Sequence, residues 1–355
     1  MRDAAAAVSF RYDAPEVTAG EFAAALAAET KAAGMDIDAY SRGGIVETFE
    51  KTFADLIGKE RAVFMPTGTL ANHLAVRSLL RGKSRVLVQE QGHLYNDSGD
   101  CLQRLSGINP VPLGFGKADF SLDEVKTAFA RAESARVEAG IGAIVIETPV
   151  RRMHGVLFGQ AGMDAVCAFA RERGAGLHLD GARIFIASAY TGIPVRTYAS
   201  AFDTVYVSLY KYFGAPSGAV LAGPAALVDG LYHERRMFGG GLNQSWIFAA
   251  AAQRSLRTFP LRFAQAVDAS ERLKVMLREI PGLSVSDIPG GTNIFSLVPP
   301  GGVTPEALRA KLAEDGVLLP AAESGTFYLK VNEGILAAAP EELAGRFAAA
   351  VRCCA

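Results

Sequence analysis

Histidine, cysteine and tryptophan are scarce in this sequence. Of its 355 residues, 5 are His, 4 are Cys and 1 is Trp. The cysteines form no CxxC pair, and no histidine has the spacing that would complete a zinc site. The sequence therefore predicts no metal centre. The four thiols, which we expect to be reduced, are Cys101, Cys167, Cys353 and Cys354.

Charge of one sign and long apolar stretches are lacking as well. The formal net charge is -1, with acidic and basic residues mixed along the chain, which argues against a surface for nucleic acid or an anionic membrane. No apolar stretch is long enough to cross a bilayer, and residues 1–8 lack the apolar core of a signal peptide. We therefore expect a cytoplasmic protein that acts on a small molecule.

A GxGxxG motif after an early strand is also absent, which argues against a nicotinamide dehydrogenase. Strand-like runs instead alternate with helical patterns from about Arg61 onward, as is typical of βαβ units and a largely parallel sheet. The sequence thus predicts an α/β fold. The expected strands are 62–65, 85–89, 110–113, 143–147, 176–180, 204–208 and 218–222, and helices are expected over 121–138 and 162–173.

A change of pattern divides the chain. With 50% hydrophobic residues and a length beyond that of one typical domain, the chain is expected to form two domains. We predict an N-terminal arm (1–45), a large α/β domain (46–245), and a connecting helix with a small α+β domain (246–355). The arm includes a strand-like run at 8–12 and leads into an amphipathic helix over 45–57. The small domain should contain strands at 293–297, 317–319 and 326–331 and helices after Thr304 and Pro340.

Reactive side chains follow two neighbouring apolar runs. Asp180 and Arg183 follow the first, and Ser208 and Lys211 follow the second. Ligands of open α/β sheets bind outside the carboxyl ends of the strands, so an acid and an amine delivered there can meet around one molecule. This arrangement suits pyridoxal phosphate. The lysine would form the Schiff base with its aldehyde, and the aspartate would keep the pyridine nitrogen protonated.

Two further strand ends carry groups that this cofactor needs. Gly68 and Thr69 open a helix after a strand, where backbone N–H groups and a hydroxyl can hold a phosphate. His93 follows the strand that ends near Gln89, so its ring can stack on a pyridine. Taken singly, each residue has a structural explanation, as a helix cap, a loop histidine or an exposed lysine. Their convergence at four strand ends favours one cofactor site.

These residues belong to motifs that occur together in one known group. The sequence resembles the threonine aldolase/β-eliminating lyase family of fold-type I pyridoxal-phosphate-dependent enzymes, in order from about Ser41 to Gln244 and more weakly to the C-terminus. The Asp-Gly-Ala-Arg-Ile-Phe run is the most specific of the motifs. They lie at 67–69, 93, 147–149, 178–185, 208–211, 215–218 and 235–241.

The resemblance implies a mainly parallel seven-stranded sheet with helices on both faces, and a role for each matching residue. Lys211 would be the Schiff-base lysine, Asp180 the partner of the pyridine nitrogen, and His93 the stacking ring; these three are the catalytic candidates. The candidate cofactor-binding residues are Gly68, Thr69, His93, Asp180, Arg183, Ser208, Lys211 and Arg236.

The resemblance also implies partners. The family assembles as dimers or dimer pairs with active sites between subunits, so we expect a homodimer or homotetramer in which Arg236 reaches the phosphate in a neighbouring subunit. Arg183 would face the carboxylate of an amino-acid substrate. Tyr12 replaces the serine of the family's N-terminal Arg-Ser-Asp and is assigned to the substrate side.

Several positions depart from the family pattern. Val150 stands where a histidine near the substrate hydroxyl is expected, and His154 is a nearby candidate to replace that group. Tyr328 stands where a carboxylate-binding arginine is expected. Since side chains in a strand repeat every two residues, Lys330 should share the face of Tyr328 and becomes a substitute candidate. Asn243 replaces the arginine of a Gly-Gly-Gly-Met-Arg-Gln motif.

The resemblance implies an aldolase. It would cleave a β-hydroxy-α-amino acid such as threonine or allo-threonine to glycine and an aldehyde through an external aldimine. The departures at Val150 and Tyr328 leave an alternative open: β-elimination, racemisation or transamination of another amino acid with the same cofactor. A non-catalytic protein that binds the cofactor or an amino acid is the third hypothesis.

Overall fold

The computed structural model describes residues 7–137 and 139–355, which form two compact units. The larger unit comprises residues 26–254, and the smaller one comprises the described residues up to 25 together with 255–355. The unit boundaries fall inside the helices α1 (Ala19–Ala33) and α12 (Trp246–Arg278). The domain boundaries expected from the sequence, after residues 45 and 245, stay predictions.

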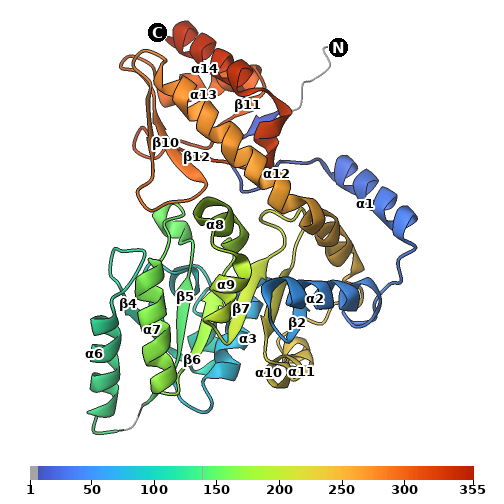
Figure 1. Ribbon diagram of the computed structural model, residues 1–355, viewed down its shortest axis with the longest axis vertical. Helices are drawn as coiled ribbons and strands as arrows, with labels where there is room; N and C mark the ends of the chain where they lie inside the picture. The colour runs from blue at the N-terminus through green and yellow to red at the C-terminus, as the bar shows by residue number, and fades with distance from the viewer. Residues whose placement is uncertain (1–6, 138) are drawn as a thin grey trace. The chain divides into compact units, whose positions relative to one another are not determined.

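A seven-stranded sheet forms the centre of the larger unit (Figure 1). Its strand order is β2-β8-β7-β6-β5-β3-β4, and all neighbouring pairs are parallel except the two that involve β8. The mainly parallel sheet predicted from the sequence is therefore confirmed. The strands are β2 (Arg61–Met65), β3 (Arg85–Gln89), β4 (Asn109–Leu113), β5 (Ile141–Glu147), β6 (Gly176–Asp180), β7 (Thr204–Ser208) and β8 (Ala219–Gly223).

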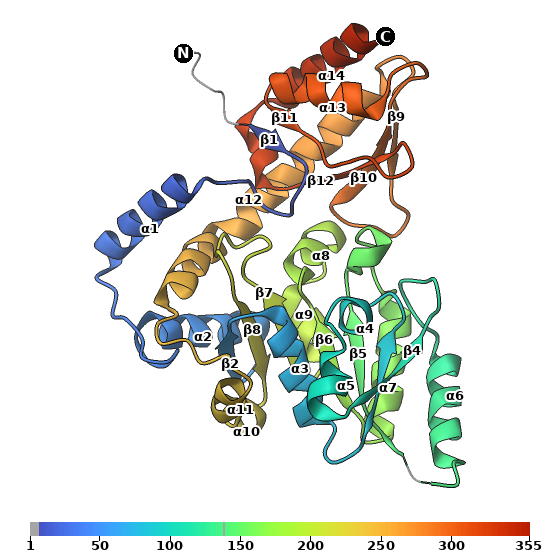
Figure 2. The ribbon, with the colours of Figure 1, turned by 180° about the vertical axis from the view of Figure 1, so that it is seen from behind.

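Helices cover both faces of this sheet, which explains why its central strands are buried along their whole length. Every residue of β5, β6, β7 and β8 is buried. The helix α7 (Gln160–Glu172) lies on the face seen in Figure 1, and α3 (Gly68–Leu79) on the face seen in Figure 2. The other helices of this unit are α2 (Gly44–Ile57), α4 (His93–Asn96), α5 (Cys101–Ser106), α6 (Leu122–Glu133), α8 (Ile184–Thr191), α9 (Val195–Ser200), α10 (Ala225–Val228) and α11 (Leu231–Met237), with a 3-10 turn η1 (Arg151–Met153).

Helix ends follow local side-chain chemistry. The helix predicted over 121–138 begins as expected, because the Ser121 hydroxyl accepts from the Glu124 backbone N–H and the Glu124 carboxylate accepts from the Ser121 N–H. It ends earlier, at Glu133, where the Ser134 hydroxyl donates to the Arg131 carbonyl and competes with the helical pattern. Residue 138 lies outside the described residues.

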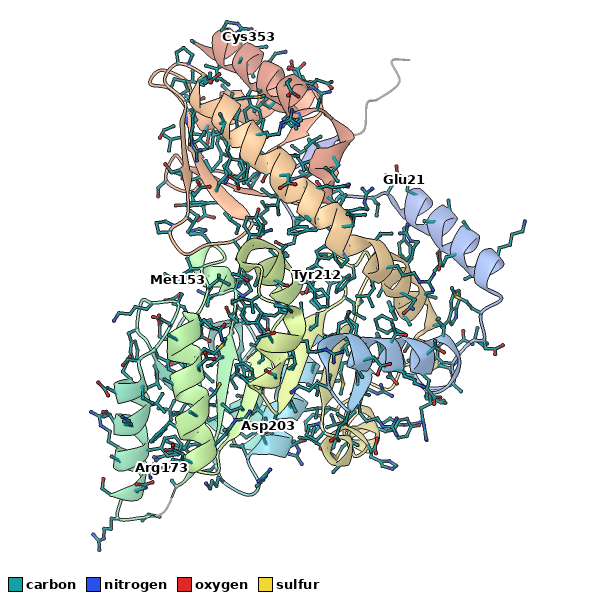
Figure 3. All side chains as sticks on the ribbon, viewed as in Figure 1. Glu21, Met153, Arg173, Asp203, Tyr212 and Cys353 are labelled. Carbon is teal, nitrogen blue, oxygen red and sulfur yellow. The ribbon has the colours of Figure 1, made fainter. Side chains whose placement is uncertain are left out.

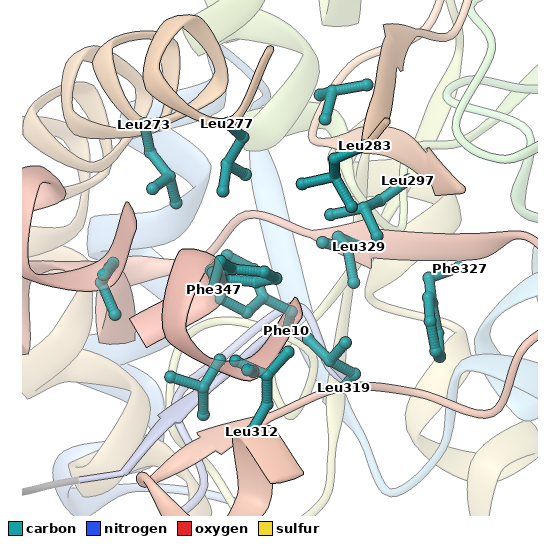
Figure 4. Packing of buried hydrophobic residues seen from close by; sticks show 14 of the residues in the cluster. Phe10, Leu273, Leu277, Leu283, Leu297, Leu312, Leu319, Phe327, Leu329 and Phe347 are labelled. Carbon is teal, nitrogen blue, oxygen red and sulfur yellow. The ribbon is translucent and has the colours of Figure 1, made fainter. Parts of the chain in front are cut away.

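The smaller unit has its own core, shown in Figure 4. β1 (Val8–Ser9) pairs in parallel with β11 (Val317–Leu318), and β9 (Ser284–Asp287), β10 (Ile294–Val298) and β12 (Phe327–Lys330) form an antiparallel sheet in the order β12-β10-β9. The ring of Phe10 packs edge-on against Phe295 and Phe347. The helices α13 (Pro305–Glu314) and α14 (Pro340–Cys354) and the 3-10 turn η2 (Glu333–Ala337) complete it.

A loop with an uncommon backbone precedes α2 in the larger unit. Tyr40 and Ser41 have positive φ angles of 52° and 59°, a conformation that side chains other than glycine adopt at a cost. The buried Asp38 carboxylate holds this loop against the start of α12, since it accepts hydrogen bonds from the backbone N–H groups of Ser41 at 2.7 Å, Ser245 at 2.8 Å and Trp246 at 2.7 Å.

Replacing Asp38 by Ala should therefore lower the free energy of unfolding by about 3 kcal/mol, because three buried donors lose a charged acceptor. Urea denaturation measures this change. Asp36→Ala is the matched control, because the Asp36 side chain is exposed and its loss should change stability by less than about 0.5 kcal/mol. Equal effects of the two substitutions would contradict this account of the loop.

Candidate active site

The polar groups expected to form a site lie at one end of the seven-stranded sheet. Figure 3 shows Met153, after β5, and Tyr212, after β7, at this end, whereas Arg173 and Asp203, which precede β6 and β7, lie at the other. In the sheet register Glu147 is paired with Asp180, and Asp180 with Tyr206. Three adjacent strands thus place their polar residues side by side where ligands of such sheets bind.

Asp180 is the most enclosed acid of this group, with an exposed fraction of 2%. Its Oδ2 accepts a hydrogen bond from the Asn72 side-chain amide at 2.6 Å, and its Oδ1 accepts from the Ala182 N–H at 3.2 Å. Asp180 is not the cap of the following helix, since α8 is preceded by Arg183 at the N-cap position. The capping explanation considered for Asp180 is therefore wrong.

His93 begins α4 and lies near both Asp180 and Lys211. Its backbone N–H donates to Glu147 Oε2 at 2.6 Å. Burial lowers the pKa of the His93 imidazole; the charge of Asp180 opposes this shift, and that of Lys211 adds to it. The Nδ1 atom is buried and has no hydrogen-bond partner among the described residues. The backbone hydrogen bond to Glu147 fixes the position of His93, and its imidazole keeps one nitrogen without a described hydrogen bond. Such a ring is suited to contact a bound ring.

The turn at the start of α3 packs directly on a tyrosine. Thr67 caps the helix by accepting from the Leu70 N–H at 3.2 Å, so the capping role of this motif is real. A Cβ at Gly68 would lie only 2.0 Å from the hydroxyl oxygen of Tyr206. Glycine is therefore required for this close approach. Thr69, in the first turn, is half-buried.

The turn after β7 carries the predicted Schiff-base lysine. Ser208, the last residue of β7, is buried, and Lys211 is half-buried in the turn that follows. The Lys211 Nζ lies 5.8 Å from the centre of the Tyr210 ring. Arg183, after β6, has an exposed fraction of 8%, and its charge acts on Glu147. The structure thus places Asp180, Lys211, His93 and the start of α3 at the same edge of the sheet.

Glu147 is a buried acid. It belongs to one of the family motifs found in the sequence, but the sequence alone assigned it no role. Its Oε1 accepts from the Arg151 N–H at 2.9 Å, while Oε2 accepts from His93. Burial, and secondly the neighbouring charge of Asp180, raise the pKa of Glu147 to about 7. Its place at the end of an apolar strand, like that of Asp180, was the signal in the sequence that could have revealed it.

Arg236 lies on the exposed side of α11. It donates to the Tyr232 hydroxyl at 3.3 Å, and its guanidinium carbon lies 4.5 Å from the centre of the Tyr40 ring. The ring of Tyr40 belongs to the loop that Asp38 holds. The two tyrosines therefore orient the exposed guanidinium of Arg236. No described carboxylate forms an ion pair with it.

The remaining predicted positions fall into both units. In the smaller unit Tyr12 is 56% exposed, and Tyr328 and Lys330 share the face of β12 opposite the buried Phe327 and Leu329. Their shared face follows the expected alternation, and the substrate roles of Tyr12 and Lys330 stay predictions.

In the larger unit Val150 is fully buried, and its N–H donates to the Val156 carbonyl at 2.8 Å. The half-buried His154 has a φ of 51°. The role of His154 as a replacement for the missing histidine stays a prediction.

The residues present fit pyridoxal phosphate. The buried Asp180 oxygens match a protonated pyridine nitrogen, the unpartnered His93 Nδ1 lies beside them, and the start of α3 offers backbone N–H groups at a positive helix end. Within residues 7–137 and 139–355, no cluster of three or more His, Cys, Asp or Glu side chains is arranged to hold a metal ion. In the same residues, no helix is both long and apolar enough to span a membrane.

The raised pKa of Glu147 predicts a pH dependence of stability. Because the folded state keeps the proton to higher pH than the unfolded state, stability falls as pH rises from about 4.5 through 7. Glu147→Gln removes this titration. We expect the variant to gain stability relative to the original protein as pH rises from about 5 to 8, measured by urea denaturation across that range. A stability difference independent of pH would refute the assignment.

Comparisons with known proteins identify the family of this chain. The sequence model of the family described as Beta-eliminating lyase matches residues 17–297. The chain is 30% identical over 257 residues to the low specificity L-threonine aldolase of Escherichia coli strain K12, covering 70% of this chain and 73% of that protein. It is 26% identical to low-specificity L-threonine aldolase 1 of Arabidopsis thaliana, over 85% of this chain and 86% of that protein. The match with the Saccharomyces cerevisiae enzyme, at 32% identity, spans 57% of this chain and only 52% of that protein.

Solved structures give the same result. A protein of Exiguobacterium, described as a candidate aromatic amino acid beta-eliminating lyase/threonine aldolase, superposes with a TM-score of 0.81 at 26% identity over 98% of both chains. A candidate L-allo-threonine aldolase of Listeria monocytogenes superposes with a TM-score of 0.80 at 25% identity, over 99% of this chain and 96% of that one. The family resemblance and the cofactor predicted from the motifs are confirmed. The chain belongs to the beta-eliminating lyase family and is a threonine aldolase-like, pyridoxal-phosphate-dependent lyase.

Proposed function

We propose that the protein is an aldolase that cleaves a β-hydroxy-α-amino acid, of the threonine or allo-threonine type, to glycine and an aldehyde. The observation that carries this proposal is the grouping of Asp180, His93 and Lys211 at the ends of β6, β3 and β7, on the same edge of the sheet and next to a helix start suited to phosphate. The names of the relatives, low-specificity L-threonine aldolases, support the same reaction.

When bound, pyridoxal phosphate supplies a ring that accepts the electron pair released from the substrate. The protein supplies the rest. Asp180, oriented by the Asn72 and Ala182 N–H groups, would pair with a protonated ring nitrogen. Lys211 supplies the amine that links the cofactor and afterwards carries protons. Backbone N–H groups at Gly68 and Thr69 hold the phosphate, and Arg183 holds the substrate carboxylate.

Proton transfer from the substrate hydroxyl needs a base that is unprotonated before the reaction. The buried Val150 cannot serve. His93 meets the requirement, because burial lowers the pKa of its imidazole and Nδ1 has no described partner. In this proposal the ring of His93 would face the cofactor and would also accept the hydroxyl proton, with His154 as the other candidate base beside the replaced position 150.

The alternative chemistry is elimination, racemisation or transamination, which needs α-proton removal by Lys211 instead of a base at the hydroxyl. The apolar Val150 is the observation that favours it. Incubation of the purified protein and cofactor with L-threonine, L-allo-threonine and L-serine separates the reactions. Glycine and acetaldehyde from the first two support the aldolase. A keto acid, a D-amino acid or no product at all would overturn it, the last in favour of a non-catalytic binding protein.

We also propose that the protein forms a homodimer or homotetramer in which Arg236 contacts the cofactor phosphate of a neighbouring subunit. The exposed guanidinium, oriented by Tyr232 and Tyr40, supports this arrangement. Light scattering coupled to size exclusion gives the assembly state. A stable monomer with full cofactor affinity would contradict the proposal.

Lys211→Ala should abolish the absorbance band of the lysine-linked cofactor and lower lyase turnover by roughly 10²-fold or more, because the amine and its proton-carrying role are lost. The exposed Lys126, on α6, provides the control Lys126→Ala, which should keep both. Spectra with added pyridoxal phosphate and a product assay make the measurement. An unchanged band in the Lys211 variant would assign the linkage to another amine.

Gly68→Ala should weaken cofactor binding by roughly tenfold or more, since the new Cβ collides with Tyr206 and displaces the phosphate turn. Equilibrium titration with pyridoxal phosphate measures the dissociation constant. Gly162→Ala, in α7, is the matched control because its Cβ would make only an ordinary contact of 3.6 Å with Phe158. Similar affinities of the two variants would show that the turn does not hold the phosphate.

A further inference from the structure

A chain of four buried polar side chains ends at Asp180. Thr204 begins β7, His178 lies in the middle of β6, Asn72 lies on α3, and Asp180 ends β6. The first three side chains have exposed fractions of 0%. Consecutive polar atoms are 2.8 Å apart from Thr204 Oγ1 to His178 Nδ1, 2.8 Å from His178 Nε2 to Asn72 Oδ1, and 2.6 Å from Asn72 Nδ2 to Asp180 Oδ2.

The direction of every hydrogen bond among these four side chains follows from the Asp180 carboxylate, where the series ends. An ionised carboxylate only accepts, so the Asn72 amide must point its N–H at Asp180 and its oxygen at His178. His178 must then donate from Nε2. Burial lowers the pKa of His178 to about 4 against the opposing effects of the Asp180 charge and of a hydrogen bond with the Thr204 backbone, so the ring is neutral near pH 7 and carries one N–H. Its Nδ1 is therefore an acceptor, and the Thr204 hydroxyl donates to it.

We propose that His178 is a positioning residue for Asp180: held as the Nε2–H tautomer by the Thr204 hydroxyl, it orients the Asn72 amide so that an N–H faces the carboxylate that pairs with the cofactor ring nitrogen. This inference rests on the proposed role of Asp180. It extends the site from the strand ends into the core between α3, β6 and β7, where none of the family motifs assigns a function to Asn72 or Thr204.

The reversed arrangement shows why the tautomer matters. If His178 carried its proton on Nδ1, Nε2 would become an acceptor and the Asn72 amide would have to turn its N–H toward it. The Asn72 oxygen would then face Asp180, and two acceptors 2.6 Å apart would repel unless Asp180 gained a proton. The protonation of Asp180 and the tautomer of His178 are thus linked through one amide group.

The neighbourhood of Asp180 makes this support necessary. Glu147 is paired with it in the sheet register, and the charge of Asp180 adds to burial in raising the pKa of Glu147. The two N–H groups at Asp180 come from Asn72 and Ala182, whereas the Glu147 carboxylate is tied to the backbone of His93 and Arg151. Removing the Asn72 donor would shift the charge away from Asp180 and weaken its pairing with a protonated ring nitrogen.

Nuclear magnetic resonance of the cofactor-loaded protein, labelled with ¹⁵N-histidine, tests the tautomer directly. With only 5 histidines in the sequence, the His178 signals are identified by their absence from His178→Gln. We expect the Nε2–H tautomer and no titration between pH 6 and 9. An Nδ1–H tautomer, or a titration within that range, would overturn the proposal. This result does not depend on the reaction that the enzyme performs.

A variant series separates positioning from stability. His178→Leu and Thr204→Val should both raise the dissociation constant of pyridoxal phosphate, and the increase for His178→Leu should be roughly tenfold. Both variants should also shift the pH at which the bound cofactor changes its absorbance. His178→Gln, which can still donate to Asn72, should restore most of the affinity. Loss of affinity in the Leu variant without rescue by Gln would contradict a role in hydrogen bonding.

His73→Leu is the matched control. His73 is also a buried histidine of the same unit, with its Nε2 2.7 Å from the Ser106 hydroxyl, and it has no described bond to the chain of four. Its replacement should lower stability in urea but leave cofactor affinity and the absorbance pH unchanged. If His178→Leu behaves in the same way, its role is structural only and the proposal fails. A protein that binds no cofactor at all would instead refute the assignment of the site.

Discussion

A negative charge at the end of a buried strand is the constraint on which this structure depends. Asp180 would pair with a protonated pyridine as a carboxylate, and a buried carboxylate needs hydrogen-bond donors. The N–H groups of Asn72 and Ala182 supply them. In the proposed site helix α3 would therefore have two functions, since its start would offer N–H groups to the phosphate while Asn72, one turn later, donates to the aspartate.

The sequence predicted the sheet well because its strands are short, apolar and bounded by polar turns. β3, β6 and β7 have the predicted limits, and the lysine and aspartate could be placed at neighbouring strand ends from order alone. The roles of Tyr206 and Asn72 could not be predicted. Every residue of β7 is buried, so no alternation shows which face Tyr206 occupies, and the contact of Asn72 joins residues 108 positions apart.

Cofactor binding and substrate choice rest on different evidence. The cofactor side is supported by contacts among β5, β6, β7 and α3, all within the larger unit. On the substrate side, the histidine expected from the family is replaced by Val150, and Tyr328 stands in place of an arginine. This contrast explains why the cofactor follows from family membership and the site geometry, whereas the cleaved bond is a proposal that a product assay must decide.

The central claim is that Lys211 links the cofactor opposite Asp180. Borohydride reduction of the cofactor-loaded protein, followed by mass spectrometry of its peptides, tests it most directly because the reduced bond is permanent. The account predicts one pyridoxyl group per chain, on Lys211. A label on another lysine, or no label in a protein that retains its fold, would contradict it.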